Sequence, residues 1–207
     1  MNRTASINLK GINIAFFRDN LTTIILLILT VISMLCGTLS LKHDAVAAFA
    51  AGKFGDFVAI RGDSRFISAF LSALIEAIKL PVFSFLCGTS VLGTIISPLV
   101  LFYAAFSYGT LSGYVYSLYG LSGIVFNLFV LLLPSLILLF VLLISAGECV
   151  DFSKKIASLC IRQTRPVNLY TNFHTFCVRH LVLLIPTLLS ALSDVALFNI
   201  FEKYFKF

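Results

Sequence analysis

The feature that most constrains this chain is an uncharged stretch in its middle. Residues 80–147 contain no Asp, Glu, Lys, Arg or His. A single helix of that length would be roughly 100 Å long, whereas the hydrocarbon core of a bilayer is about 30 Å thick. The stretch therefore has to fold back on itself as a hairpin of at least two spans. Residues 130–144 are almost wholly apolar, which argues against the alternating strands of a membrane β-barrel.

The composition of the whole chain points to lipid as its solvent. The chain is 59% hydrophobic and 12% charged, with a mean hydropathy of +1.04, whereas about a quarter of the residues of a soluble domain are charged. So few polar side chains cannot cover the exterior of a water-soluble fold of 207 residues. We therefore predict an all-α, polytopic helical membrane protein with a single membrane domain, residues 1–207.

The net charge of +6 does not indicate a nucleic-acid partner. Its basic residues are scattered in short loops beside apolar runs. The anionic headgroups of the lipid bilayer are the simpler expected partner.

Apolar runs separated by charged or small residues divide the chain into five predicted spans. Their approximate bounds are residues 21–41, 66–87, 94–118, 124–147 and 181–201. The first span resembles an uncleaved signal anchor with its amino terminus inside, because three basic residues precede it: Arg3, Lys10 and Arg18. As an alternative for the second span, residues 66–79 would lie at the interface and the span would begin near Leu80.

In this topology the two longest connections lie on opposite sides of the membrane. Residues 42–65 form an outside loop with one short amphipathic helix, and the basic residues 148–179 form an inside loop. Apolar side chains recur at helical spacing in the first part of the inside loop: Phe152, Ile156, Leu159 and Cys160. This pattern predicts an interfacial amphipathic helix that lies on the inner membrane surface.

Small residues recur at every fourth position of the third predicted span. They are Ala105, Gly109, Gly113 and Ser117. Such a face lets helix backbones approach closely, which is a principal source of helix association in lipid. Gly88 and Gly93 bound a run of small residues where the chain is expected to turn tightly. We interpret these residues as packing within one monomer, with a homo-oligomer or partner interface as the alternative.

Three ionisable residues lie inside predicted spans, namely Glu76, Lys79 and Asp194. Such groups are costly in a bilayer, and many of them are functional. Glu76 and Lys79 are one helical turn apart, so each can neutralise the other. Asp194 lies in the outer half of the fifth span without a near basic neighbour in sequence. Water or a polar neighbour could satisfy it, so we favour a structural role over a functional one for these groups.

No motif in the sequence indicates catalysis, a metal site or a cofactor. His174, Cys177 and His180 recur three residues apart, but zinc usually needs four organised ligands. Residues 120–123, Gly-Leu-Ser-Gly, match the string that carries the serine of rhomboid proteases. In the predicted topology Ser122 lies at the outer surface and His180 at the inner one, so the two cannot form a catalytic pair. We predict a non-catalytic protein.

A familiar order of motifs runs through the middle spans. The run FLCGTSVLG at residues 85–93 is followed by an apolar run with Pro98, by FSYG at residues 106–109 and by a long apolar helix. This order resembles the stage II sporulation protein M family, mainly over residues 66–150. Ala105 departs from the pattern, because another glycine is expected there.

The resemblance implies a role rather than a reaction. It implies a non-catalytic component of the engulfment machinery in the mother-cell membrane of endospore-forming bacteria. The implied partners are the peptidoglycan-degrading sporulation proteins D and P.

These observations support two functional hypotheses. The leading one is a scaffold in the cell membrane, whose outside loop and helix surfaces recruit envelope-remodelling partners. The second is a subunit of a small-solute transporter or channel, in which Glu76, Lys79, Asp194 and the tyrosines of the third span line a path. The third and fourth spans lack ionisable residues, so ion coupling would rest on very few groups.

Overall fold

The computed structural model describes residues 20–62, 65–162 and 169–201, and no strand occurs among them. In chain order the elements are α2 (Leu21–Leu39), the 3₁₀ helix η1 (Ser40–Lys42), α3 (Asp44–Arg61), α4 (Phe66–Gly88), α5 (Gly93–Phe126), the π-helix η2 (Asn127–Leu132), α6 (Leu133–Arg162) and α7 (Leu169–Phe201). The predicted all-α, polytopic class is confirmed.

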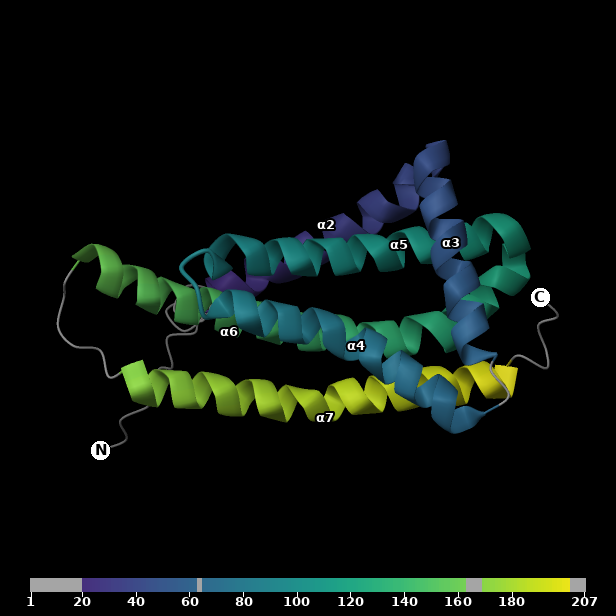
Figure 1. The fold of residues 1–207 in the computed structure, drawn as a ribbon. Helices are drawn as coiled ribbons and strands as arrows, with labels where there is room; N and C mark the ends of the chain where they lie inside the picture. The colour runs from purple at the N-terminus through teal and green to yellow at the C-terminus, as the bar shows by residue number, and fades with distance from the viewer. Residues whose placement is uncertain (1–19, 63–64, 163–168, 202–207) are drawn as a thin grey trace, which may run out of the picture.

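Four helical segments in the described residues are long and apolar enough to cross a membrane. They are Leu21–Lys42, Phe66–Gly88, Gly93–Cys160 and Tyr170–Phe201. The third has 68 residues, far more than the roughly 20 that span a bilayer once. Figure 1 shows it as two antiparallel arms, α5 and α6, which is the hairpin expected from the uncharged stretch.

The chain reverses between these arms at Gly120. This residue has φ 53° and ψ −127°, whereas its neighbours in α5 are helical. An L side chain is strained at such a φ, but glycine adopts it freely. A β-carbon at Gly120 would meet no other atom within 4 Å, so the need for glycine is conformational rather than steric. The turn lies in the interval between the predicted spans 94–118 and 124–147.

The helices form an antiparallel bundle with two distinct ends (Figure 1). The Gly120 end holds the α5–α6 turn, α3 and the C-terminal end of α7. The Gly88 end holds the α4–α5 turn and the C-terminal end of α6. Helix α3 lies across the Gly120 end and contacts α4, α5 and α7. Helix α2 packs on α5, and α4 contacts α5, α6 and α7.

Helix α4 packs into the bundle through a stripe of small residues. Its buried positions are Ala69, Ala73, Ala77, Pro81, Ser84 and Gly88. They pack against a core that includes Leu101 of α5, Leu142 of α6 and Val195 of α7. Short side chains on one helix and larger ones on its neighbours let the backbones approach closely. Since the whole of α4 carries this buried stripe, residues 66–79 belong to the same helix as residues 80–88.

The small-residue ladder of α5 packs against α2 within the monomer. A β-carbon at Gly109 would collide with the backbone of Met34, and one at Gly113 would collide with Leu41. The hydroxyl of Thr38 also donates a hydrogen bond to the carbonyl of Gly109, at 3.1 Å. Ala105 is fully buried. Ser117 is exposed, and its hydroxyl bonds only within its own helix, to the carbonyl of Tyr114.

The predicted outside loop, residues 42–65, is mostly helix α3, which has 18 residues. Phe54 and Phe57 are buried in a cluster with Phe126, Val130 and Phe198. The ring centroids of Phe57 and Phe198 are 5.7 Å apart in an edge-to-face arrangement, which is a favourable aromatic geometry. This cluster fixes α3 on the Gly120 end of the bundle.

The first part of residues 148–179, where the sequence predicted an interfacial amphipathic helix, is the end of a longer helix. Helix α6 continues to Arg162 and α7 begins at Leu169, so the spans extend into the predicted loop. Gly147 does not end α6, because one glycine inside a helix costs only about 1 kcal/mol. Continuing the helix buries Cys149 and Phe152 against Phe176 of α7. The basic residues Arg3, Lys10, Arg18, Arg165, Lys203 and Lys206 lie outside the described residues.

Candidate functional site

A cavity of about 310 Å³ lies between α3, α4, α5, α6 and α7. Six ionisable side chains line it, from three helices: Lys53, Asp56, Arg61, Glu76, Lys79 and Asp194. Neutral polar groups complete the lining: Tyr103, Ser107, Tyr108, Ser135 and Ser190. We call this the polar cavity. It contrasts with the apolar core around it, and it gathers all three ionisable residues singled out from the predicted spans.

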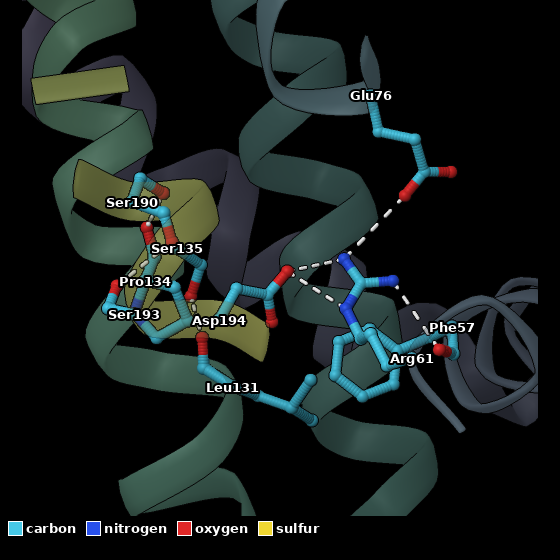
Figure 2. A network of polar contacts seen from close by, with 9 residues as sticks. All are labelled: Phe57, Arg61, Glu76, Leu131, Pro134, Ser135, Ser190, Ser193 and Asp194. Atoms are coloured by element: carbon cyan, nitrogen blue, oxygen red, sulfur yellow. Dashed lines mark hydrogen bonds and ion pairs between the residues drawn. The ribbon is translucent and has the colours of Figure 1, made fainter. Parts of the chain in front are cut away.

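An ion pair between α3 and α7 forms one side of the polar cavity. The guanidinium of Arg61 donates to Asp194 Oδ2 through Nε, at 2.9 Å, and through Nη2. Both residues are buried, with 6% and 8% of their surfaces exposed. The guanidinium also lies over the ring of Phe57, with Cζ 3.9 Å from the ring centroid (Figure 2). Burying both charges is expensive, and their pairing together with the contacts of the guanidinium to Phe57 offsets the cost.

Glu76 of α4 approaches the same guanidinium from another side. Its Oε2 lies 3.6 Å from Arg61 Nη2, and the side chain is partly exposed. Figure 2 shows Arg61 between the two carboxylates. The predicted pairing of Glu76 with Lys79 is therefore replaced by a pairing with Arg61, and no ion pair joins Glu76 to Lys79 in the described part of the chain. Arg61 links α3, α4 and α7 through these contacts.

Two buried polar atoms that belong to the lining residues have no hydrogen-bond partner among the described residues. They are Asp194 Oδ1 and Ser107 Oγ. The other serines are satisfied: Ser190 Oγ donates to the carbonyl of Pro134 at 2.8 Å, and Ser135 Oγ donates to the carbonyl of Leu132 at 3.1 Å. Buried polar groups are nearly always hydrogen-bonded in proteins. Asp194 Oδ1 and Ser107 Oγ are therefore buried atoms with unused hydrogen-bonding capacity beside the polar cavity.

Charged groups also stand on the exposed side of the polar cavity. Lys53, Asp56 and Lys79 line it and are exposed. None of the three forms an ion pair with another residue that the structure describes. Their charges are consequently available to a bound molecule.

A second polar cluster lies toward the Gly88 end. The hydroxyls of Ser84 and Ser97 are 2.8 Å apart, and Cys149 Sγ donates to the carbonyl of Ser84 at 3.2 Å. His180 Nε2 lies 3.1 Å from Ser145 Oγ and 3.6 Å from Cys149 Sγ. These groups do not line the polar cavity, and their hydrogen bonds join α4, α5, α6 and α7.

The glycines of the α4–α5 turn are positioned by α6. A β-carbon at Gly88 would crowd Cys149, and one at Gly93 would collide with Ser153. The hydroxyl of Ser153 donates to the carbonyls of Gly88, at 3.0 Å, and Ser90, at 2.7 Å. These contacts hold the turn against α6, so the two glycines have a packing role.

The remaining motifs are dispersed by the fold. The described residues contain no group of three His, Cys, Asp or Glu side chains that could hold a metal ion, so His174 and Cys177 do not gather around His180. Ser122 follows the turn at Gly120, whereas His180 contacts Ser145 and Cys149 toward the opposite end.

Arg61 is the central residue of the site that sequence analysis missed, and Lys53, Asp56 and Ser107 were likewise not singled out. Arg61 lies in a segment that was predicted to be an aqueous loop, and 133 positions separate it from Asp194. No local spacing signals such a pairing. The signal that existed was indirect: a carboxylate inside a span needs a partner, and the nearest candidates were cations at the ends of other spans.

Fold and site together define a class: an all-α polytopic helical protein with membrane-compatible spans and a charged cavity between them. Comparison of the chain with models of known families, with curated proteins and with solved structures gives no match in any of the three.

Proposed function

We propose that this chain binds a small polar solute inside the membrane and acts as a component of a transporter or channel. The observation that supports this most is the convergence of Arg61, Glu76 and Asp194, from three helices, on the polar cavity. Ionisable residues are rare in membrane spans and commonly mark substrate or ion pathways. Sites between the helices of a bundle are also a usual place for small ligands.

The composition of the polar cavity favours this function over a purely structural one. An ion pair that served only to join helices would need no space beside it, whereas here about 310 Å³ adjoins the pair. Two tyrosines of the third predicted span, Tyr103 and Tyr108, also line that space. With the amino terminus inside, the polar cavity lies toward the outer side of the membrane.

The direct test is solute entry into proteoliposomes, followed by light scattering after an osmotic step. Proteoliposomes with the purified protein should admit at least one class among small cations, anions, zwitterions and neutral polyols faster than protein-free vesicles do. Asp194→Asn should abolish the difference, because it removes a charge from the cavity wall. Asp44→Asn is the matched control, since Asp44 is an exposed residue of α3 that does not line the polar cavity. Equal rates in protein-free and protein-containing vesicles for every class would contradict the proposal.

A second candidate function, the membrane scaffold, is favoured by the resemblance over residues 66–150. Within that segment Gly88 and Gly93 serve close helix packing, in keeping with a shared helical framework. The extension of α6 and α7 beyond the Gly88 end, joined by an ion pair between Glu148 and Arg179, offers a surface for partners. Affinity purification from membranes of spore-forming cells should then recover peptidoglycan-degrading proteins together with this chain. Recovery no higher than with an unrelated multi-pass protein would count against the scaffold.

A further inference from the structure

The charges around Arg61 leave one side of the polar cavity negative, with Arg61 and Asp194 buried and Glu76 at its exposed edge. One guanidinium faces the carboxylates of both Asp194 and Glu76, so this group carries one net negative charge when all three are ionised. A like-charged ligand group would be repelled here, whereas a cationic group would complete the neutralisation. This side of the polar cavity therefore selects for positive charge.

The hydrogen-bonding capacity of the same wall points to a donor-rich cation. Asp194 Oδ1 accepts no hydrogen bond and Ser107 Oγ has no partner in the described structure. An ammonium group has three donors and no acceptor, so it matches a wall whose unused groups are hydrogen-bond acceptors. A carboxylate placed there would meet the unpaired acceptor of Asp194 and leave it unsatisfied.

The exposed side of the polar cavity has the opposite character. Lys53, Lys79 and Asp56 line it without ion pairs among the described residues, which gives one net positive charge. A ligand that carries an anionic group at its other end can pair with Lys79 or Lys53. The volume of about 310 Å³ is at the lower limit of ligand pockets, so the molecule has to be small.

We infer that the polar cavity binds small zwitterions, with an ammonium group against Asp194 Oδ1 and Ser107 Oγ and an anionic group against Lys79. This inference rests on the proposed solute-binding function and names its ligand class. Two polarised sides in one cavity discriminate zwitterions from simple amines and from simple acids. Each of those lacks one of the two charged ends.

The test uses matched probes on the full chain in detergent micelles, with the midpoint of thermal unfolding as readout. Glycine, β-alanine and 4-aminobutanoate supply both charges at increasing separation, while methylammonium and acetate supply one charge each. At least one zwitterion should raise the midpoint of thermal unfolding. Its apparent affinity should be about tenfold higher than that of methylammonium, because its anionic group adds a second charged contact. Acetate should have no effect.

Two substitutions check the polarity of binding without breaking a native contact. Ser107→Ala should lower the affinity for zwitterions and for methylammonium alike, by about tenfold, because it removes one acceptor for the ammonium group. Lys79→Gln should lower the affinity for zwitterions to that for methylammonium. The affinity for methylammonium itself should stay unchanged. Lys42→Gln, at an exposed lysine outside the polar cavity, should change neither.

The outcomes separate this inference from the function on which it rests. Stabilisation by acetate but by no amine would overturn the assigned polarity, while solute binding itself would stand. If none of the probes raised the midpoint and the proteoliposomes admitted no solute, the inference and the proposed function would both fail.

Discussion

Replacing Asp194 with alanine should lower the free energy of unfolding by about 3–5 kcal/mol. The substitution leaves the guanidinium of Arg61 buried, with only the partly exposed Glu76 to neutralise it. Removing one partner of a buried ion pair is costly, because the remaining charge keeps its desolvation penalty. Reversible unfolding in mixed micelles measures the change. Asp44→Ala is the control, since Asp44 is exposed and lies outside the polar cavity.

A double substitution separates the loss of pairing from the loss of the side chain. Arg61→Met with Asp194→Leu removes both charges and keeps apolar volume, so it should recover most of the stability lost in Asp194→Ala. It should not recover solute entry, because the charged wall of the polar cavity is gone. Stability in Asp194→Ala equal to that of the unmodified chain would show that the pair does not hold α3 to α7.

Replacing Gly109 with leucine should detach α2 from α5. Even a β-carbon at this position would collide with the backbone of Met34. Backbone atoms cannot relieve such a collision by a rotamer change, as a side chain can. Overpacking of this kind costs about 1–3 kcal/mol for modest additions and more for large ones. The midpoint of thermal unfolding should fall sharply for Gly109→Leu and by less for Gly109→Ala. Gly55→Leu is the control, because a β-carbon at Gly55 would meet nothing within 4 Å.

The same variant distinguishes the two interpretations of the small-residue ladder. If the ladder packs within one monomer, Gly109→Leu lowers stability at every protein concentration and leaves the mass of the micelle-bound particle unchanged. Dissociation of an oligomer without a loss of monomer stability would instead assign Gly109 to an interface between copies. Light scattering coupled to size-exclusion chromatography measures that mass.

The parts of the fold that could be predicted are those set by composition and local sequence. The uncharged residues 80–147 required a hairpin, and Gly120 provided the backbone freedom for its turn. The bounds of α4 were likewise visible as an apolar run between Arg65 and the small residues near Gly88. Hydrophobic length and glycine placement act locally, so they can be recognised without knowing the fold.

The parts that could not be predicted depend on contacts between distant segments. Glu76 and Lys79 are one turn apart, yet Glu76 turns to Arg61, because a buried guanidinium attracts a carboxylate more strongly than an exposed lysine does. The end of α6 was placed too early, since the burial of Phe152 against Phe176 depends on how α7 returns. Arg61 could not be recognised from the sequence for the same reason, because its burial depends on how α3 packs on the bundle.

The central claim is that charged residues enclose a polar space within the bundle. Chemical modification of a cysteine introduced at position 107 tests this claim most directly. In a variant without the five native cysteines, Ser107→Cys should react in intact membranes with a methanethiosulfonate that carries an ammonium group. Phe140→Cys should not react, because Phe140 lies on the exposed apolar surface of α6, which we expect to face lipid. Equal protection of both cysteines from the reagent would contradict the claim.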